Sequence, residues 1–316
     1  MNSPALLPLD PAKFRDPART AKGDPRATVA LGDLRTLWLN TGTLCNIACE
    51  GCYIGSSPRN DRLAYLTRAD ARGYLDEIVR SRLPTREIGL TGGEPFMNPD
   101  AIGIIEDALD AGFRVLVLTN AMKPMERWKP DLLRLRTVGP DRLALRVSLD
   151  HYGPERHEEI RGPRTWAPAI EGLFWLALNG FDVRVATRLT GGEYDAETRV
   201  GFARLFATLG VAIYAGDPLA LVCFPEMDVA ADVPEISTAC WGILGKSPSD
   251  VMCASSRMVV KRRGALAPAV VVCTLLPYEP EFELGPTLAS AARPISLNHP
   301  HCARFCVLGG ASCSAG

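Results

Sequence analysis

The sequence lacks both a strong net charge and a long hydrophobic run. Its 35 Lys and Arg residues and 36 Asp and Glu residues leave a formal net charge of −1. A chain this close to neutral has no strong field to attract nucleic acid or an anionic membrane surface. No apolar stretch approaches the ~20 residues that span a bilayer. Residues 1–27 also lack the basic and apolar segments of a signal peptide. We therefore expect a cytoplasmic protein with no nucleic-acid or membrane partner.

Cysteine is absent from the middle of the chain, although the sequence contains ten cysteines. None lies between Cys52 and Cys223. Disulfides are disfavoured in the reducing cytoplasm, so clustered cysteines there indicate metal binding or redox chemistry. Three cysteines lie early, and the others fall in the last third: Cys223, Cys240, Cys253, Cys273, Cys302, Cys306 and Cys313.

Apolar, β-branched segments alternate with amphipathic segments over much of the chain, which predicts about six β/α units and an α/β fold. Such a series forms a parallel sheet, either doubly wound or curled into a full or partial TIM-type barrel. Polar residues follow the ends of five of the expected strands, where barrel enzymes carry their chemistry. Strands are expected near 35–43, 86–91, 114–120, 142–150, 182–189 and 218–224, and helices near 67–81, 100–113, 125–136, 166–181 and 195–210.

The pattern changes near residue 225, where prolines, short apolar runs and cysteines replace the β/α repeat. We therefore divide the chain into an N-terminal arm at 1–35, a β/α core at 36–225 and a cysteine-rich C-terminal module at 226–316.

The segment CNIACEGC places Cys45, Cys49 and Cys52 in a C-x3-C-x2-C pattern. A closed zinc site needs four ligands, so three thiolates would need a fourth ligand from elsewhere. Three thiolates on a 4Fe–4S cluster would instead leave one iron without a protein ligand. Three buried apolar cysteines are the remaining alternative.

The cysteine segment is followed by TGGEP at 91–95, and together the two motifs resemble the radical S-adenosylmethionine (SAM) superfamily over roughly residues 36–225. The resemblance implies a partial (β/α)6 barrel in which Cys45, Cys49 and Cys52 hold a 4Fe–4S cluster whose open iron binds SAM. It also implies a reductant such as flavodoxin or ferredoxin, and a 5′-deoxyadenosyl radical that abstracts hydrogen from the substrate. Many members carry an aromatic residue just before the third cysteine, whereas this chain has Gly51 there and Tyr53 after the cluster.

The resemblance also implies which residues bind SAM. Gly92, Gly93 and Glu94 match the loop that receives the amino group, and Glu94 offers a carboxylate acceptor. Ser148 and Asp150 match positions near the ribose or the carboxylate. Arg161 matches a basic residue that pairs with the SAM carboxylate, since a guanidinium donates two parallel hydrogen bonds.

The C-terminal cysteines resemble the auxiliary-cluster modules called SPASM or twitch. The best set of four ligands for an auxiliary 4Fe–4S cluster is Cys253, Cys273, Cys302 and Cys306. Cys240 and Cys313 are ambiguous and leave open a second auxiliary cluster, while Cys223 is assigned to the core. Zinc is the alternative metal, because four thiolates also suit it.

These features predict a radical SAM oxidoreductase or maturase acting on an unidentified small metabolite or peptide. An auxiliary cluster would serve electron transfer or substrate binding. The related molybdenum-cofactor GTP cyclases end in Gly-Gly, whereas this chain ends SCSAG. The alternative from another class is a non-catalytic iron–sulfur electron-transfer or sensor protein on a degenerate barrel.

Overall fold

The computed structural model describes residues 7–189, 195–225 and 228–310. Its main element is a nine-stranded sheet in the order β10-β9-β8-β2-β3-β4-β5-β6-β7. The six strands β2–β7 run parallel to their neighbours, as the sequence predicts. Their bounds are β2 Thr36–Asn40, β3 Glu87–Thr91, β4 Arg114–Thr119, β5 Leu143–Ser148, β6 Asp182–Arg188 and β7 Leu221–Phe224.

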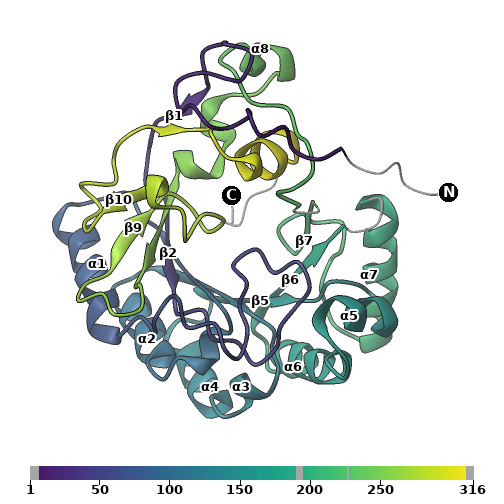
Figure 1. The fold of residues 1–316 in the computed structure, drawn as a ribbon. Helices are drawn as coiled ribbons and strands as arrows, with labels where there is room; N and C mark the ends of the chain where they lie inside the picture. The colour runs from purple at the N-terminus through teal and green to yellow at the C-terminus, as the bar shows by residue number, and fades with distance from the viewer. Residues whose placement is uncertain (1–6, 190–194, 226–227, 311–316) are drawn as a thin grey trace.

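The sheet curves around a central space, and the helices lie outside it (Figure 1). This is the partial barrel that the sequence predicts, open between the edge strands β7 and β10. The helices are α1 Arg68–Arg80, α2 Ala101–Asp110, α3 Lys123–Glu126, α4 Lys129–Val138, α5 Pro154–Arg161, α6 Trp166–Leu178, α7 Asp195–Leu209 and α8 Cys240–Leu244.

The predicted start of α1 is confirmed. The Thr67 side chain accepts a hydrogen bond from the backbone of Asp70, and the Asp70 side chain accepts one from the backbone of Thr67. This capping box satisfies two amide groups that the first helical turn leaves unpaired. The short helix α5, by contrast, lies between the strand expected near 142–150 and the helix expected near 166–181, where no helix was predicted.

The interior of the barrel is filled below the mouth. Trp38 on β2 is fully buried and lies opposite Gly89 on β3. A Cβ atom at Gly89 would lie 2.3 Å from the Trp38 ring. The absence of a side chain at 89 therefore makes room for the buried indole of Trp38.

The C-terminal part of the chain continues the same sheet. Strand β8 (Ser256–Val260) pairs in parallel with β2, and β9 (Ala269–Val271) and β10 (Glu283–Gly285) extend the sheet in antiparallel order. The π-helix η5 (Cys302–Leu308) lies near the open side of the barrel (Figure 1). The division at residue 225 stays a prediction.

The N-terminal arm lies along the C-terminal part. Strand β1 (Thr28–Val29) pairs with β11 (Ile295–Ser296). Arg26 forms a buried ion pair with Glu235 at 2.5 Å. Among the described residues, no helix has the length and apolar character required to cross a membrane.

Candidate functional site

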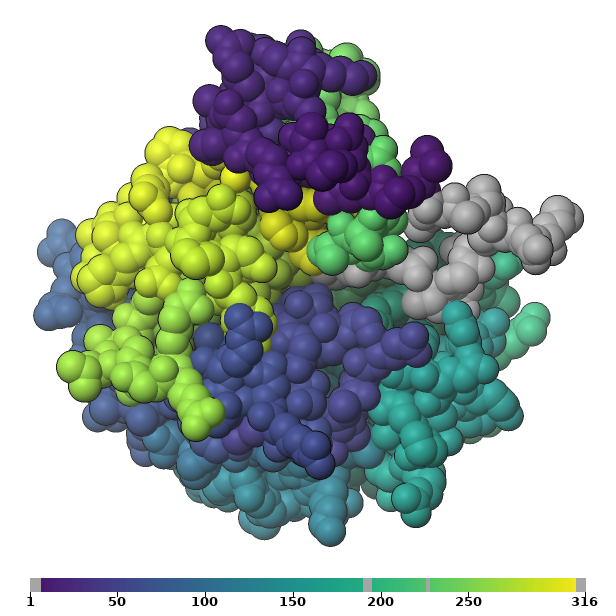
Figure 2. Space-filling view, in the orientation of Figure 1, coloured from purple at the N-terminus to yellow at the C-terminus, as the bar shows by residue number. Residues whose placement is uncertain are grey.

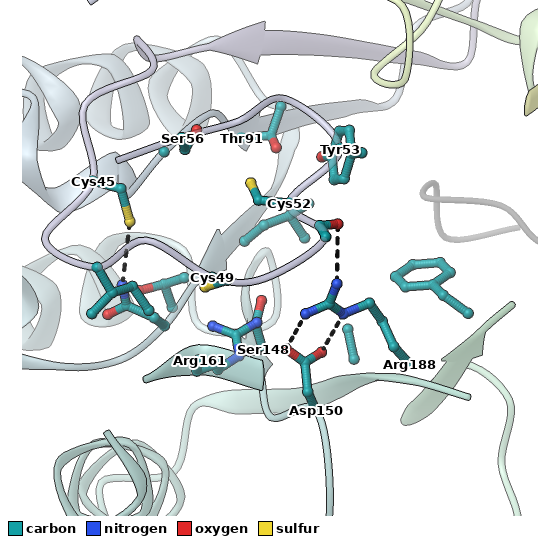
Figure 3. A pocket seen from close by; sticks show the side chains of 18 of the residues that line it. Cys45, Cys49, Cys52, Tyr53, Ser56, Thr91, Ser148, Asp150, Arg161 and Arg188 are labelled. Atoms are coloured by element: carbon teal, nitrogen blue, oxygen red, sulfur yellow. Dashed lines mark hydrogen bonds and ion pairs between the residues drawn. The ribbon is translucent and has the colours of Figure 1, made fainter. Parts of the chain in front are cut away.

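A pocket of about 1060 Å³ opens at the carboxyl ends of the parallel strands. The loop that carries Cys45, Cys49 and Cys52 forms one side of it and lies at the centre of the face shown in Figure 2. Figure 3 shows the three thiols on one side and, on the other, Asp150 from the loop after β5 with Arg161 of α5 and Arg188 of β6. The lining also includes Gly92, Gly93, Asn120, Arg146, Ser148, Asp150, Arg161, Arg188, Phe224, Leu275 and Phe305.

The three cysteine thiols differ in exposure. Cys45 is buried, and Cys49 and Cys52 are partly exposed. Burial raises the pKa of Cys45 to about 12. Burial also raises the pKa of Cys49, and the nearby positive charge of Arg161 partly offsets this effect. The Asn120 amide nitrogen lies 3.9 Å from Cys45 Sγ and donates to Asn46 Oδ1 at 2.9 Å. Among the described residues lining this pocket there is no fourth cysteine.

Gly92 and Gly93 border the pocket, but their closest neighbour is the cysteine loop itself. A Cβ atom at Gly92 would lie 2.4 Å from the Gly42 carbonyl oxygen, and one at Gly93 would lie 2.1 Å from the Leu44 carbonyl oxygen. The Gly93 amide donates to the Gly42 carbonyl at 2.8 Å. The glycine pair therefore joins the loop after β3 to the cysteine loop, in addition to lining the cavity.

Glu94 lies behind these glycines and does not line the pocket. One carboxylate oxygen accepts from the Thr119 hydroxyl at 2.8 Å and from the Phe96 amide at 3.2 Å. The other oxygen accepts from the backbone N–H of Asn120 at 2.8 Å. Burial raises the pKa of Glu94 to about 7 despite these three donors. Glu94 thus holds the ends of β3 and β4 together.

Asp150 lies between two arginines. Arg161 Nε donates to Asp150 Oδ2 at 2.7 Å, while Arg188 donates to Oδ1 at 3.1 Å and to Oδ2 at 3.0 Å. Burial alone would raise the pKa of Asp150, but the two guanidinium groups lower it below its usual value. Asp150 is therefore the anion that orients both arginines.

The two arginines differ in what else they bind. Arg188 also donates through its remaining terminal nitrogen to the backbone carbonyls of Glu50 and Gly51 at 3.0 and 3.1 Å. Among the described residues, neither terminal nitrogen of Arg161 has a hydrogen-bond acceptor. Arg161 therefore keeps the forked donor pair that suits a carboxylate ligand.

Arg188 was not singled out from the sequence. Its position at the carboxyl end of a predicted strand was the only available signal, because its carbonyl partners are more than a hundred residues away in the chain.

A second, smaller pocket of about 340 Å³ lies among C-terminal segments. Cys253, Cys273, Cys302 and Cys306 all line it, together with apolar residues and His301. Mutual repulsion between Cys302 and the thiols of Cys273 and Cys253 adds to burial in raising the pKa of Cys302. Among the described residues, no group of three or more His, Cys, Asp or Glu side chains is arranged to hold a single metal ion.

The other cysteines lie elsewhere. Cys240 begins α8 and approaches Ser237 at 3.5 Å, and Cys223 on β7 packs against the core. Neither residue lines either pocket. Cys313 lies outside the described residues. The two cysteine pockets adjoin at Leu275, which lines both.

The chain is similar in sequence to proteins that are named for different functions. It is 29% identical over 172 residues to the AdoMet-dependent heme synthase of Methanosarcina barkeri, covering 54% of this chain and 46% of that protein. It is 29% identical over 143 residues to the antilisterial bacteriocin subtilosin biosynthesis protein AlbA of Bacillus subtilis, covering 45% of this chain and 30% of that protein. The chain thus spans less than half of the length of these two curated relatives.

The fold is shared with a solved structure of native anSMEcpe with bound AdoMet and Cp18Cys peptide. The TM-score is 0.57 at 13% identity, with 81% of this chain and 79% of that chain covered. The family model of the radical SAM superfamily matches residues 39–206 of this sequence. This range is more than half of the chain and includes the cysteine loop. The protein therefore belongs to the radical SAM superfamily.

Proposed function

We propose that this protein is a radical SAM oxidoreductase or maturase. The single observation that carries the proposal is the composition of the larger pocket. Within the part of the chain that the structure describes, it brings three thiols and no fourth cysteine together with Gly92, Gly93, Ser148 and Arg161. When bound to Cys45, Cys49 and Cys52, a 4Fe–4S cluster with SAM would supply a 5′-deoxyadenosyl radical for hydrogen abstraction from the substrate.

The residues of the pocket fit these groups. Three thiols without a fourth suit a cluster that keeps one metal position open to a ligand. The terminal nitrogens of Arg161 suit the carboxylate of SAM, and its ion pair with Asp150 fixes the guanidinium plane. Glu94 accepts hydrogen bonds from Thr119 and Asn120 behind the Gly92–Gly93 loop. In our proposal it therefore positions the loop that borders SAM.

We propose further that Cys253, Cys273, Cys302 and Cys306 hold an auxiliary 4Fe–4S cluster. Support comes from their common position around one apolar pocket, which adjoins the larger one at Leu275. The apolar lining limits solvent access, which is one of the factors that set the reduction potential of such clusters.

We propose a peptide side chain as the substrate, with a small metabolite as the alternative. AlbA is named for bacteriocin biosynthesis and the solved neighbour contains a peptide, which supports the first. The side of the pocket formed by Phe224, Leu275 and Phe305 is apolar and would receive the reacting group. The two aromatic rings lie 5.3 Å apart, which gives this wall a fixed shape.

The test is anaerobic reconstitution followed by counting iron and sulfide, then addition of dithionite and SAM. Formation of 5′-deoxyadenosine with about eight irons per chain supports two 4Fe–4S clusters. About four irons with SAM cleavage would remove the auxiliary cluster from the proposal and leave zinc or a structural role for the C-terminal cysteines. Iron without SAM cleavage would favour the electron-transfer or sensor alternative.

The substrate class needs a separate measurement. The peptide fraction and the small-metabolite fraction of a cell extract are added separately to the reconstituted protein with SAM. Faster 5′-deoxyadenosine formation with the peptide fraction alone supports a peptide substrate. Stimulation confined to the metabolite fraction would contradict it.

A further inference from the structure

The turn between Cys49 and Cys52 depends on a residue from a distant strand. The Cys52 amide donates to the Cys49 carbonyl at 3.4 Å, and Gly51 within the turn has φ of +63°. Residues other than glycine adopt this conformation with difficulty. The carbonyls of Glu50 and Gly51 both accept from Arg188 Nη1. The turn that spaces two of the three thiols is thus bound directly to the end of β6.

Arg188 is held in place by the ion pair that fixes its other two nitrogens. Its Nε and Nη2 donate to the two oxygens of Asp150, whose side chain is almost completely buried. A planar guanidinium engaged on all three nitrogens has no free rotation. Arg188 therefore acts as a rigid link from the end of β6 to the cysteine loop, fixed by Asp150 in the loop after β5 (Figure 3).

Gly51 is matched to this link. A Cβ atom at Gly51 would lie 3.1 Å from Arg188 Nη1, a contact tighter than most side chains tolerate. In this chain, the glycine before the third cysteine therefore leaves room for the Arg188 guanidinium. An aromatic residue at position 51 would require the arginine to move.

We propose that Arg188 is a positioning residue that holds the Glu50–Gly51 turn, and through it Cys49 and Cys52, in the arrangement needed for the three-thiol site. Gly51 is the residue that makes room for it. The proposal rests on the proposed function in assigning a cluster to these thiols. The link itself is present in the protein without any bound group.

The charges of the same residues favour the site as well. Asp150, Arg161 and Arg188 together carry one net positive charge beside Cys49, whose thiol lies within the influence of all three. A net positive neighbour stabilises thiolates and an anionic cluster. Arg188 therefore contributes to the three-thiol site in two ways: it holds the Glu50–Gly51 turn, and it adds positive charge beside Cys49.

The matched control is Arg184 on the same strand. Arg184 is ion-paired to Asp182 at 2.8 Å and lies four residues before Arg188, away from the cysteine loop. Arg188→Gln removes the charge and the fork. Arg188→Lys keeps the charge but replaces the fork with a single ammonium group. Arg184→Gln removes an ion pair from the same strand whose carboxylate is more exposed than that of Asp150.

The first measurement is hydrogen exchange of the apo protein over residues 46–56. The Glu50 and Gly51 carbonyls lose their charged donor in Arg188→Gln, so we expect about tenfold faster exchange in this variant. Arg184→Gln should match the wild type in this segment, and Arg188→Lys should fall between them. Unchanged exchange in Arg188→Gln, or equal acceleration in Arg184→Gln, would overturn the proposal.

The second measurement is the rate at which the reconstituted protein loses iron to a chelator. Only the Cys49-dependent iron is counted, which is the iron that the wild type binds and Cys49→Ala does not. We expect about tenfold faster loss in Arg188→Gln. Gly51→Ala should accelerate loss in the wild-type background and do so less in the Arg188→Gln background, because the close contact is then absent. Additive effects of the two changes would overturn the pairing of Gly51 with Arg188.

The two measurements separate the two claims. Faster exchange in Arg188→Gln without any Cys49-dependent iron in the wild type supports the link and contradicts the proposed function. Cys49-dependent iron that Arg188→Gln retains at the wild-type rate supports the proposed function and contradicts the link.

Discussion

The two cysteine pockets are built in opposite ways. The three thiols of the larger pocket come from one loop of eight residues, and charged or amide groups from β4, β5, α5 and β6 surround them. The four thiols of the smaller pocket come from three segments, because Cys302 and Cys306 both lie on η5, and mostly apolar side chains surround them. A local motif can therefore be read directly from its spacing. A site assembled from distant segments depends on the fold that brings them together.

The largest expected effect comes from breaking the local site. Cys49→Ala should abolish SAM cleavage and remove about four irons, because two remaining thiolates do not hold a cluster with its open position in place. The measurement is 5′-deoxyadenosine formation together with iron content. Cys223→Ala is the control, since this cysteine on β7 lines neither pocket. Substantial SAM cleavage by Cys49→Ala would show that the trio is not the cluster site.

The next effect should come from the assembled site. Cys302→Ala should lose the auxiliary cluster and product formation but retain some uncoupled 5′-deoxyadenosine formation, because the larger pocket keeps its own ligands. Product and 5′-deoxyadenosine are measured in the same reaction. Cys240→Ala, which changes a cysteine outside both pockets, should behave like the wild type. Equal loss of both activities in Cys302→Ala would contradict the division of roles between the two pockets.

The pockets also differ in carboxylates. The buried Glu94 lies behind the glycines that line the larger pocket, and no Asp or Glu is among the described residues that line the smaller one. The pKa of Glu94 is about 7 in the folded protein against an ordinary value of 4.5, so folding favours the protonated form. The stabilising contribution is fully present below pH ~4.5 and is lost as pH rises through ~7. Across this interval, the free energy of unfolding of the apo protein should fall by up to about 3 kcal/mol from this group.

Urea unfolding at several pH values tests this dependence. Glu94→Gln removes the titration, and the slope of stability against pH between 4.5 and 7 is compared with that of the wild type. A constant offset from the altered hydrogen bonds does not affect the slope. Identical slopes in the two proteins would show that Glu94 keeps an ordinary pKa.

How far the sequence predicts the structure follows the same contrast. The six parallel strands, the Thr67 cap and the closely spaced cysteines are all local patterns, and the model and the family match bear out the fold and the family that they indicate. Strand and helix periodicity depends on neighbouring residues, so these elements can be read without knowing what they pack against.

The remaining features depend on contacts between distant residues. The addition of β8 beside β2 and the binding of Arg188 to the Gly51 carbonyl join segments that are far apart in the chain. No local spacing records such a contact. Helix α5 was missed for another reason, because it buries only His157 and Ile160 and therefore shows little apolar periodicity.

The smallest effect should come from the contact between the two cysteine regions. The Tyr278 hydroxyl, from the C-terminal part, donates to the Ile54 carbonyl in the cysteine loop at 2.8 Å and accepts from Asn60 at 3.3 Å. Tyr278→Phe keeps the ring under Arg62 and should lower the free energy of unfolding by about 1 kcal/mol. Tyr214→Phe is the control, because Tyr214 is 76% exposed.

If the two pockets form independently, Tyr278→Phe leaves the iron content of both unchanged. Loss of iron from the larger pocket in this variant would show instead that the local motif needs the C-terminal segment to bind its cluster, and the contrast between local and assembled sites would then fail for the cysteine loop itself.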